Sequence, residues 1–193
     1  MNINTRFTQL SAIAPLALIT SLLLASSLAR AEMTISSDDI RGAELMPKAQ
    51  EFKGFGCDGD NRSPQLSWQG APAATKAYAV FAYDPDAPTG SGWWHWQLVN
   101  IPADTTTLAA GAGAADNTAL PAGSMQMRND YGVHAFGGAC PPAGDKAHRY
   151  QFTVFALKQK LELPADASAA LTGYMVRANA LDSVTLEALY QRD

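Results

Sequence analysis

The stretch from residue 83 to residue 96, YDPDAPTGSGWWHW, constrains the fold most, because it joins two apolar segments through a short, stiff and acidic loop. The ring of Pro85 fixes its own φ and favours extended backbone at Asp84. Side chains two residues apart on extended backbone point the same way, so the carboxylates of Asp84 and Asp86 are predicted to face one spot. His95 follows a glycine-containing turn and lies between two tryptophans. Stiff backbone, paired carboxylates and a titratable ring predict a preformed polar pocket.

The apolar segments on either side of this loop are the strongest strand predictions. Residues 76–83 are apolar on both faces, which predicts a central strand that is covered on both sides. Further strands are predicted at 94–101, 149–157 and 184–190, with a short one at 125–128. The chain is therefore expected to form a mostly β domain.

Helix is expected to be scarce and peripheral. Apolar residues recur at helical spacing in residues 166–181, where Asp166 is a suitable N-cap. Residues 109–123 are rich in Ala and Gly and are predicted to run over the surface without regular structure.

The first 31 residues have the pattern of a cleaved signal peptide. Arg6 precedes an apolar run at 10–28, and residues 29–31, Ala-Arg-Ala, have the small-x-small form that signal peptidase cuts. Cleavage there leaves residues 32–193 as a single domain in an exported, periplasmic protein. The alternative is an uncleaved membrane anchor, which is disfavoured because the apolar run is short and interrupted.

The charge of the chain limits its partners. Loss of the first 31 residues, which hold two arginines and no acidic residue, changes the formal net charge from −4 to −6. An acidic chain without a Lys/Arg block is a poor candidate for binding nucleic acid or an anionic membrane through its overall field. We therefore expect no nucleic-acid partner and no stable membrane insertion, and any bound anion must be held by local groups.

The two cysteines, Cys57 and Cys140, are 83 residues apart, which fits no zinc or CxxC redox motif. In an exported protein the pair is expected to form one structural disulfide. Two free buried thiols, or a Cys140 nucleophile acting with a histidine, are the alternatives.

Three more segments have the composition of a binding site: 61–68, 136–142 and 147–150. The glycines of 136–142 allow backbone N–H groups to approach a ligand, and its prolines keep the loop stiff. Arg149 alternates away from its neighbours on the predicted strand, so we expect it to form a structural salt bridge.

Structural explanations of the same residues stay open at this point. Asp84 and Asp86 are common turn formers, His95 and His148 could be packing residues, and the tryptophans could serve as core. His95 and His148 with one aspartate would also suit a transition metal in ligand type, although we expect no metal and no cofactor.

Four motifs in a fixed order resemble the phosphatidylethanolamine-binding protein family, and the bacterial, Raf-kinase-inhibitor-like branch is the most similar. The resemblance extends over nearly the whole chain after residue 31. The motifs are DPDAP at 84–88, HW at 95–96, GGACPP at 137–142 and HRY at 148–150, preceded by the similar segment CDGDNRSPQLSW at 57–68.

This resemblance implies a fold, a pocket and a backbone feature. The fold is a large antiparallel sheet packed on a smaller one, with helices at the edges. The pocket binds small anions, such as phosphate or a phosphoryl headgroup, and the peptide bond before Pro88 is expected to be cis. Carried over residue by residue, the implied ligand-binding residues are Asp84, Asp86, His95, Gly138, Cys140, Pro142, His148 and Tyr150.

A carboxylate beside a histidine raises the pKa of that histidine, so Asp84 or Asp86 is expected to keep His95 or His148 charged. Anion binding would then weaken above about pH 7, where the imidazolium loses its proton. Two close carboxylates sharing a proton, one of them donating to a phosphoryl oxygen, are the second possibility.

The function that we expect is non-enzymatic binding of a small anion by an exported protein. The chain has no G-x-S-x-G elbow, P-loop or H-E-x-x-H motif. Inhibition of a kinase or protease through the pocket rim is one alternative, and a hydrolase using Asp/His chemistry is another. The bacterial relatives also imply a homodimer.

Overall fold

The large sheet of the protein is built around the predicted central strand. In the computed structural model, which describes residue 1 and residues 32–193, five strands lie in the order β10–β9–β5–β6–β8, and each neighbouring pair is antiparallel. The predicted signal peptide lies outside the described residues, apart from its first residue. The strand bounds are Ala77–Asp84 for β5, Trp93–Pro102 for β6, Met125–Gln126 for β8, His148–Leu157 for β9 and Ala180–Tyr190 for β10.

A smaller sheet packs on this large one. Its three strands lie in the order β1–β4–β7, and β2 and β3 form a separate short hairpin. A 3-10 turn, η1, precedes the hairpin, and the α-helix α1 directly precedes β10. The bounds are Thr34–Ser36 for β1, Lys48–Gln50 for η1, Lys53–Gly54 for β2, Cys57–Asp58 for β3, Leu66–Gln69 for β4, Thr107–Leu108 for β7 and Ala169–Asn179 for α1. The predicted mostly β fold with two packed sheets is confirmed.

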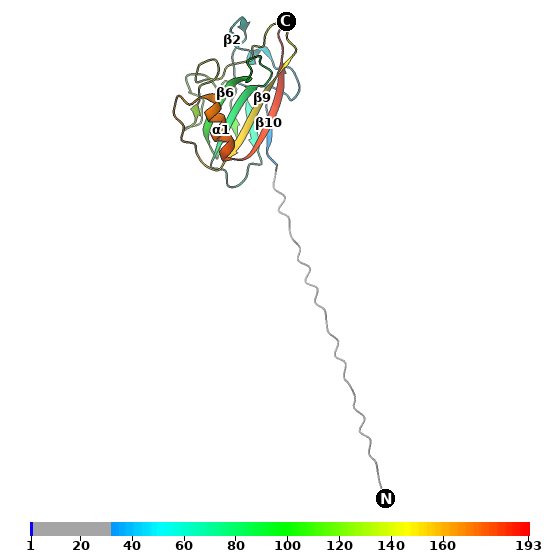
Figure 1. Ribbon diagram of the computed structural model, residues 1–193, viewed down its shortest axis with the longest axis vertical. Coiled ribbons are helices and arrows are strands. Elements are labelled where there is room, and N and C mark those ends of the chain that lie inside the picture. The colour runs from blue at the N-terminus through cyan, green and yellow to red at the C-terminus, as the bar shows by residue number, and fades with distance from the viewer. Residues whose placement is uncertain (2–31) are drawn as a thin grey trace.

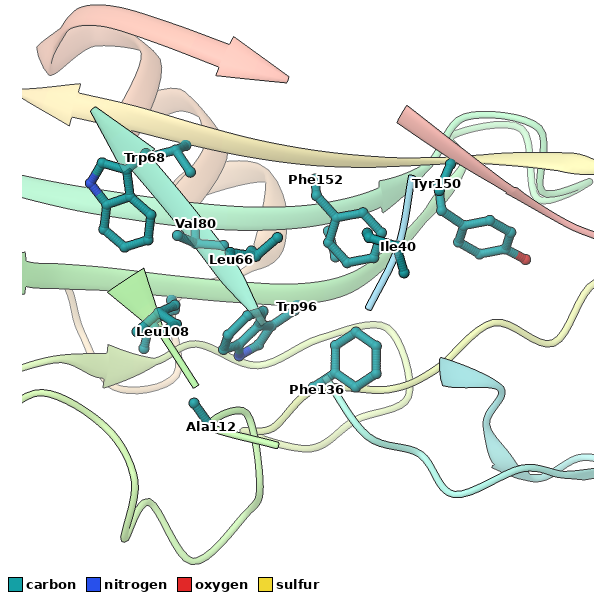
Figure 2. Close-up of a cluster of buried hydrophobic side chains, with 14 of the residues drawn as sticks. Ile40, Leu66, Trp68, Val80, Trp96, Leu108, Ala112, Phe136, Tyr150 and Phe152 are labelled. Atoms are coloured by element: carbon teal, nitrogen blue, oxygen red, sulfur yellow. The ribbon is translucent and has the colours of Figure 1, made fainter. Parts of the chain in front are cut away.

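The main hydrophobic core fills the space between the large and the three-stranded sheet (Figure 2). Leu66 and Trp68 of β4 meet Val80 of β5 and Trp96 of β6 there, and none of the four is more than 3 % exposed. Full burial of one such side chain stabilises the fold by about 1.5–3 kcal/mol. This layer therefore holds the two sheets together.

Helix α1 covers the opposite face of the large sheet, across β6 and β9 (Figure 1). Val176 of α1 belongs to one buried cluster with Phe81 of β5 and Phe155 of β9. Strand β5 is thus buried on both faces, as predicted, with only Tyr83 partly exposed.

The C-terminal helix is shorter than predicted, and its N-cap is a different residue. Ser168 caps α1, since its hydroxyl accepts the N–H of Leu171 at 3.1 Å, so Asp166 lies before the helix. Strand β10 begins directly at Ala180, because residues from there on pair with the end of β9. That pairing overrides the helical spacing of the last predicted residues. Of the helices in residues 32–193, none has the length and apolar character needed to cross a bilayer.

A buried asparagine joins the large sheet to the segment that follows β9. Asn100 lies at an irregularity in the β5–β6 pairing and has a φ of 59°. Its side chain donates to the carbonyl of Leu161 at 2.9 Å and accepts the N–H of Leu161 at 2.8 Å. One side chain thereby satisfies both backbone groups of a buried residue.

We expect Asn100→Gly to lower the free energy of unfolding by about 2–4 kcal/mol, because it leaves two buried backbone groups unpaired. Glycine adopts a positive φ without strain, so the decrease in the free energy of unfolding measures the loss of the two hydrogen bonds. Ala43→Gly is the matched control, since Ala43 has the same φ of 59° but is exposed and has no side-chain hydrogen-bonding group. Urea denaturation of both variants checks this, and equal losses in the two would contradict it.

Candidate functional site

The side chains predicted for the site gather at one end of the core between the two sheets. A cavity of about 170 Å³ opens where β5 ends and where β6 and β9 begin. Asp84 is the last residue of β5 and His148 the first of β9, and both line the cavity. Figure 2 shows Tyr150 at the edge of the hydrophobic cluster, with its hydroxyl pointing away from the cluster.

A β-bulge in β6 turns His95 toward this cavity. Consecutive residues of β5 pair with Trp96 and Trp94, so His95 is an extra residue in β6. Trp96 therefore packs between the sheets while Trp94 packs on the α1 side, although residues two apart on a regular strand share a face. As a result His95 lines the same cavity as Asp84 and Tyr150.

Backbone carbonyls, rather than a carboxylate, hold the ring of His95. Nδ1 lies 2.8 Å from the oxygen of Gly137 and 3.1 Å from that of Gly138. Carbonyl oxygens only accept hydrogen bonds, so Nδ1 carries a proton. Burial lowers the pKa of His95, although the two carbonyls and the charge of Asp84 act in the opposite direction. Burial therefore favours the neutral ring, which has its lone pair on Nε2, so of the two histidines expected to be charged beside a carboxylate, His95 is not the one.

A carboxylate does orient the second histidine. Oδ2 of Asp84 lies 2.8 Å from Nδ1 of His148, and both side chains are only 3 % exposed. Oδ1 of Asp84 accepts the backbone N–H groups of Asp86 at 2.7 Å and Ala87 at 3.1 Å. Nε2 of His148 lies 3.5 Å from a carboxylate oxygen of Asp145. Three donors thus satisfy the buried charge of Asp84.

Asp86 does not share this environment. Its carboxylate forms a two-pronged pair with the guanidinium of Arg149, at 2.9 and 2.8 Å, and accepts the backbone N–H of Arg149 at 3.0 Å. The hydrogen bond from Arg149 holds the pKa of Asp86 well below its ordinary value. The predicted salt bridge of Arg149 is confirmed. The prediction that both carboxylates face one spot is wrong, because the chain bends at residues 85–87, directly after β5, and Asp86 pairs with Arg149.

The peptide bond before Pro88 is trans, like every peptide bond that the structure describes. The expected cis bond is therefore wrong. Oδ1 of Asp84 accepts the backbone N–H of Ala87, and the carbonyl of Ala87 accepts the N–H of Thr89 at 2.8 Å. These two hydrogen bonds stabilise the turn with the peptide bond in the trans form, which has the lower energy.

Two hydrogen-bond donors line the cavity without a partner. The hydroxyl of Tyr150 and the indole N–H of Trp93 are buried, and neither has a hydrogen-bond partner among residues 32–193. Burial raises the pKa of Tyr150, and the charge and the weak hydrogen-bonding influence of the nearby Asp84 carboxylate add to this shift, although no hydrogen bond of ordinary geometry joins the two, so the hydroxyl keeps its proton. An unpaired buried polar group costs about 1–3 kcal/mol, which a ligand that accepts from both donors would offset.

The loop 137–142 forms another wall of the cavity. A disulfide joins Cys140 to Cys57 of β3, so the predicted pairing is present and Cys140 has no free thiol. Cys140, Pro141 and Pro142 all line the cavity. The disulfide thereby ties the loop to the β2–β3 hairpin.

The two glycines of this loop support His95 from behind. The N–H of Gly137 donates to the carbonyl of His95 at 2.9 Å, and that of Gly138 donates to Oδ1 of Asn61 at 2.7 Å. The expectation that these N–H groups approach a ligand is therefore wrong. A Cβ on Gly138 would lie 2.4 Å from the oxygen of Gln50, so only glycine fits there.

Comparison with known proteins agrees with this fold. Residues 36–191 match the family described as phosphatidylethanolamine-binding protein. The protein YbcL of Escherichia coli is 51% identical over 162 residues, which are 83% of this chain and 88% of YbcL. The chain belongs to the phosphatidylethanolamine-binding protein family.

Other similar proteins match over different shares of their own length. YbhB of E. coli is 45% identical over 82% of this chain and 99% of its own. A protein of Mycobacterium tuberculosis named as a lipoprotein, LppC, is 36% identical over 59% of this chain and 52% of its own. The crystal structure of E. coli YbcL superposes with a TM-score of 0.83 and covers 84% of this chain and all of that one.

The structure of this family member brings together six of the eight predicted residues at the cavity. Gly138 contacts the ring of His95 through its carbonyl and does not line the cavity, and Asp86 is paired with Arg149 outside the cavity lining. The six cavity residues are Asp84, His95, Cys140, Pro142, His148 and Tyr150.

Sequence reasoning missed Phe55 and Tyr131 and assigned Trp93 to packing, yet all three line the cavity. Phe55 lies two residues before Cys57, so the predicted disulfide could have located it near the loop. Tyr131, which donates to the carbonyl of Gly138 at 2.9 Å, gives no signal in the sequence.

We expect Arg149→Gln to raise the pKa of Asp86 toward its ordinary value of about 3.9, because the guanidinium favours the carboxylate. A depressed folded-state pKa contributes stability above the unfolded pKa and loses it as the pH falls. The variant is therefore less stable than the parent at neutral pH, and the difference shrinks in acid.

Titration of carboxyl carbon shifts by NMR, with acid unfolding curves, checks this prediction. Lys48→Gln is the control, since Lys48 pairs with Asp58 at 2.5 Å but both side chains are mostly exposed. A pKa of Asp86 that stays depressed in Arg149→Gln would contradict the assignment.

Proposed function

We propose that the protein is an exported binding protein that holds a small anion, phosphate or a phosphoryl headgroup, in the cavity beside His95. The observation that carries this proposal is the pair of buried donors without partners, the Tyr150 hydroxyl and the Trp93 indole N–H. Buried polar groups in folded proteins are nearly always paired, so two in one cavity point to an oxygen-rich ligand.

The size of the cavity favours a small ligand. Pockets for drug-sized molecules measure about 300–1,000 Å³, whereas this cavity measures about 170 Å³. A tetrahedral oxyanion or a short headgroup is therefore a better match than a large cofactor. Membership of the phosphatidylethanolamine-binding protein family supports the same class of ligand, because phosphatidylethanolamine has a phosphoryl headgroup.

The buried carboxylate of Asp84 does not prevent anion binding on this account. His148 and the two turn N–H groups already donate to its oxygens, so the carboxylate is stabilised by hydrogen bonds of its own. Asp84 then serves to fix His148 at the cavity wall, and the ligand is contacted by neutral donors.

Binding rather than turnover is the chemistry that we propose. Cys140 is in a disulfide, and the hydroxyl of Thr89 at the cavity donates to the carbonyl of Gly92 at 2.5 Å. Among residues 32–193, no three His, Cys, Asp or Glu side chains lie in a group that could hold a metal ion. What the cavity offers is a set of oriented hydrogen-bond groups.

Export to the periplasm is part of the proposal. A structural disulfide persists in oxidising compartments and is rare in the cytosol. The similarity to LppC, named as a lipoprotein, supports an exported protein as well.

We expect Tyr150→Phe to weaken the binding of phosphate about 10- to 100-fold, because it removes one hydrogen bond to a charged ligand. The unfolding temperature without ligand should not fall, since the deleted hydroxyl is unpaired. Calorimetric titration and thermal unfolding measure the two quantities.

Tyr174→Phe on the exposed face of α1 is the matched control and should bind as the parent does. The absence of any phosphate-dependent rise in unfolding temperature for the parent protein would contradict the proposed function.

A further inference from the structure

The histidine at the cavity wall can accept a hydrogen bond from a ligand. Nδ1 of His95 donates to two backbone carbonyls, which cannot donate in return. In a neutral imidazole the other nitrogen is then an acceptor. Nε2 has no hydrogen-bond partner among residues 32–193, and the ring lines the cavity. The cavity is therefore lined by one free acceptor, on His95, as well as by the donors of Tyr150 and Trp93.

We propose that the cavity selects oxyanions that carry a proton, a phosphate or a phosphomonoester monoanion, because the ligand hydroxyl donates to Nε2 of His95. This inference rests on the proposed function and adds the protonation state of the ligand to it. Oxygens without a proton accept from Tyr150 and Trp93, and the oxygen with the proton faces His95. An anion without a proton would set an oxygen against the lone pair of Nε2.

The surroundings of His95 keep its ring neutral against two negative charges. Burial lowers the pKa of His95, whereas Asp84 of β5 and Asp130 of the segment after β8 favour the charged form. The ring centroids of Tyr131 and Tyr150 lie 5.6 and 5.1 Å from that of His95, and burial raises the pKa of both phenols, so they stay neutral. His148 at the same cavity is held on Asp84.

Two pairs of probes separate the ligand proton from charge and size. Inorganic phosphate and sulfate have the same shape, but only phosphate keeps a proton near neutral pH. Methyl phosphate and dimethyl phosphate are both monoanions at about pH 5, below the second phosphoester pKa of about 6, but only methyl phosphate has a hydroxyl. Calorimetric titration of the protein with all four probes measures the preference.

We expect phosphate to bind at least about 100-fold more tightly than sulfate, and methyl phosphate at least about 100-fold more tightly than dimethyl phosphate, since a polar site rejects an analogue that leaves it unpaired. The affinity for methyl phosphate should fall about tenfold for each pH unit above about 6, as the ligand loses its proton. The ¹⁵N shift of Nε2 in His95 should also move on binding, as expected for a nitrogen that accepts a hydrogen bond.

Two variants make the assignment to His95 specific. His95→Gln can turn an amide N–H toward the ligand, so the preference for phosphate over sulfate should collapse. Tyr150→Phe removes a donor that serves both anions, so both affinities should fall while their ratio is kept. Circular dichroism spectra and unfolding temperatures confirm that both variants are folded.

The outcomes are distinguishable from failure of the proposed function. Equal binding of phosphate and sulfate, or a preference confined to one pair of probes, overturns the selection by a ligand proton but leaves the anion cavity intact. A ¹⁵N titration in which His95 becomes an imidazolium at neutral pH overturns it as well. Binding of none of the four probes overturns both the inference and the proposed function.

Discussion

The β-bulge in β6 is the constraint on which the site depends. Without the extra residue, His95 would lie on the α1 side of the large sheet and Trp94 between the sheets. With it, His95 lies at the end of the main core, beside Asp84 and Tyr150. The same bulge brings the ring against the carbonyls of the loop that closes the cavity. Strand pairing, rather than any loop conformation, therefore decides which chemical groups meet.

The loop 137–142 turns this arrangement into a fixed one. The disulfide at Cys140, the hydrogen bond from Gly138 to Asn61 and the tight packing at Gly138 hold the loop at one position. Its carbonyls then set the tautomer of His95, since they can only accept. Hydrogen bonds fix the carboxylate of Asp84 as well, because its oxygens accept from His148 and from a backbone N–H of the following turn. A polar site of this kind is preorganised before a ligand enters.

The sequence predicted the strands and the segments that meet at the site, because apolar patterning and ordered motifs report directly on burial and proximity. The predictions from sequence were wrong where a single residue lies on the other face of a strand or pairs with a different side chain. The bulge at His95 leaves no mark in the alternation of residues 93–102. The Asp84 side chain accepts the backbone N–H of Asp86, so the chain bends directly after β5 and Asp86 pairs with Arg149. The charge state of His95 also depended on burial, which residue types alone do not reveal.

The central claim is that neutral donors and a histidine acceptor bind a small oxyanion at one end of the inter-sheet core. A crystal structure of the protein grown with inorganic phosphate tests it most directly. The account predicts phosphate oxygens at hydrogen-bond distance, about 2.6–3.2 Å, from the Tyr150 hydroxyl, the Trp93 indole nitrogen and Nε2 of His95. A cavity that holds only water at saturating phosphate, or phosphate bound elsewhere on the protein, would contradict it.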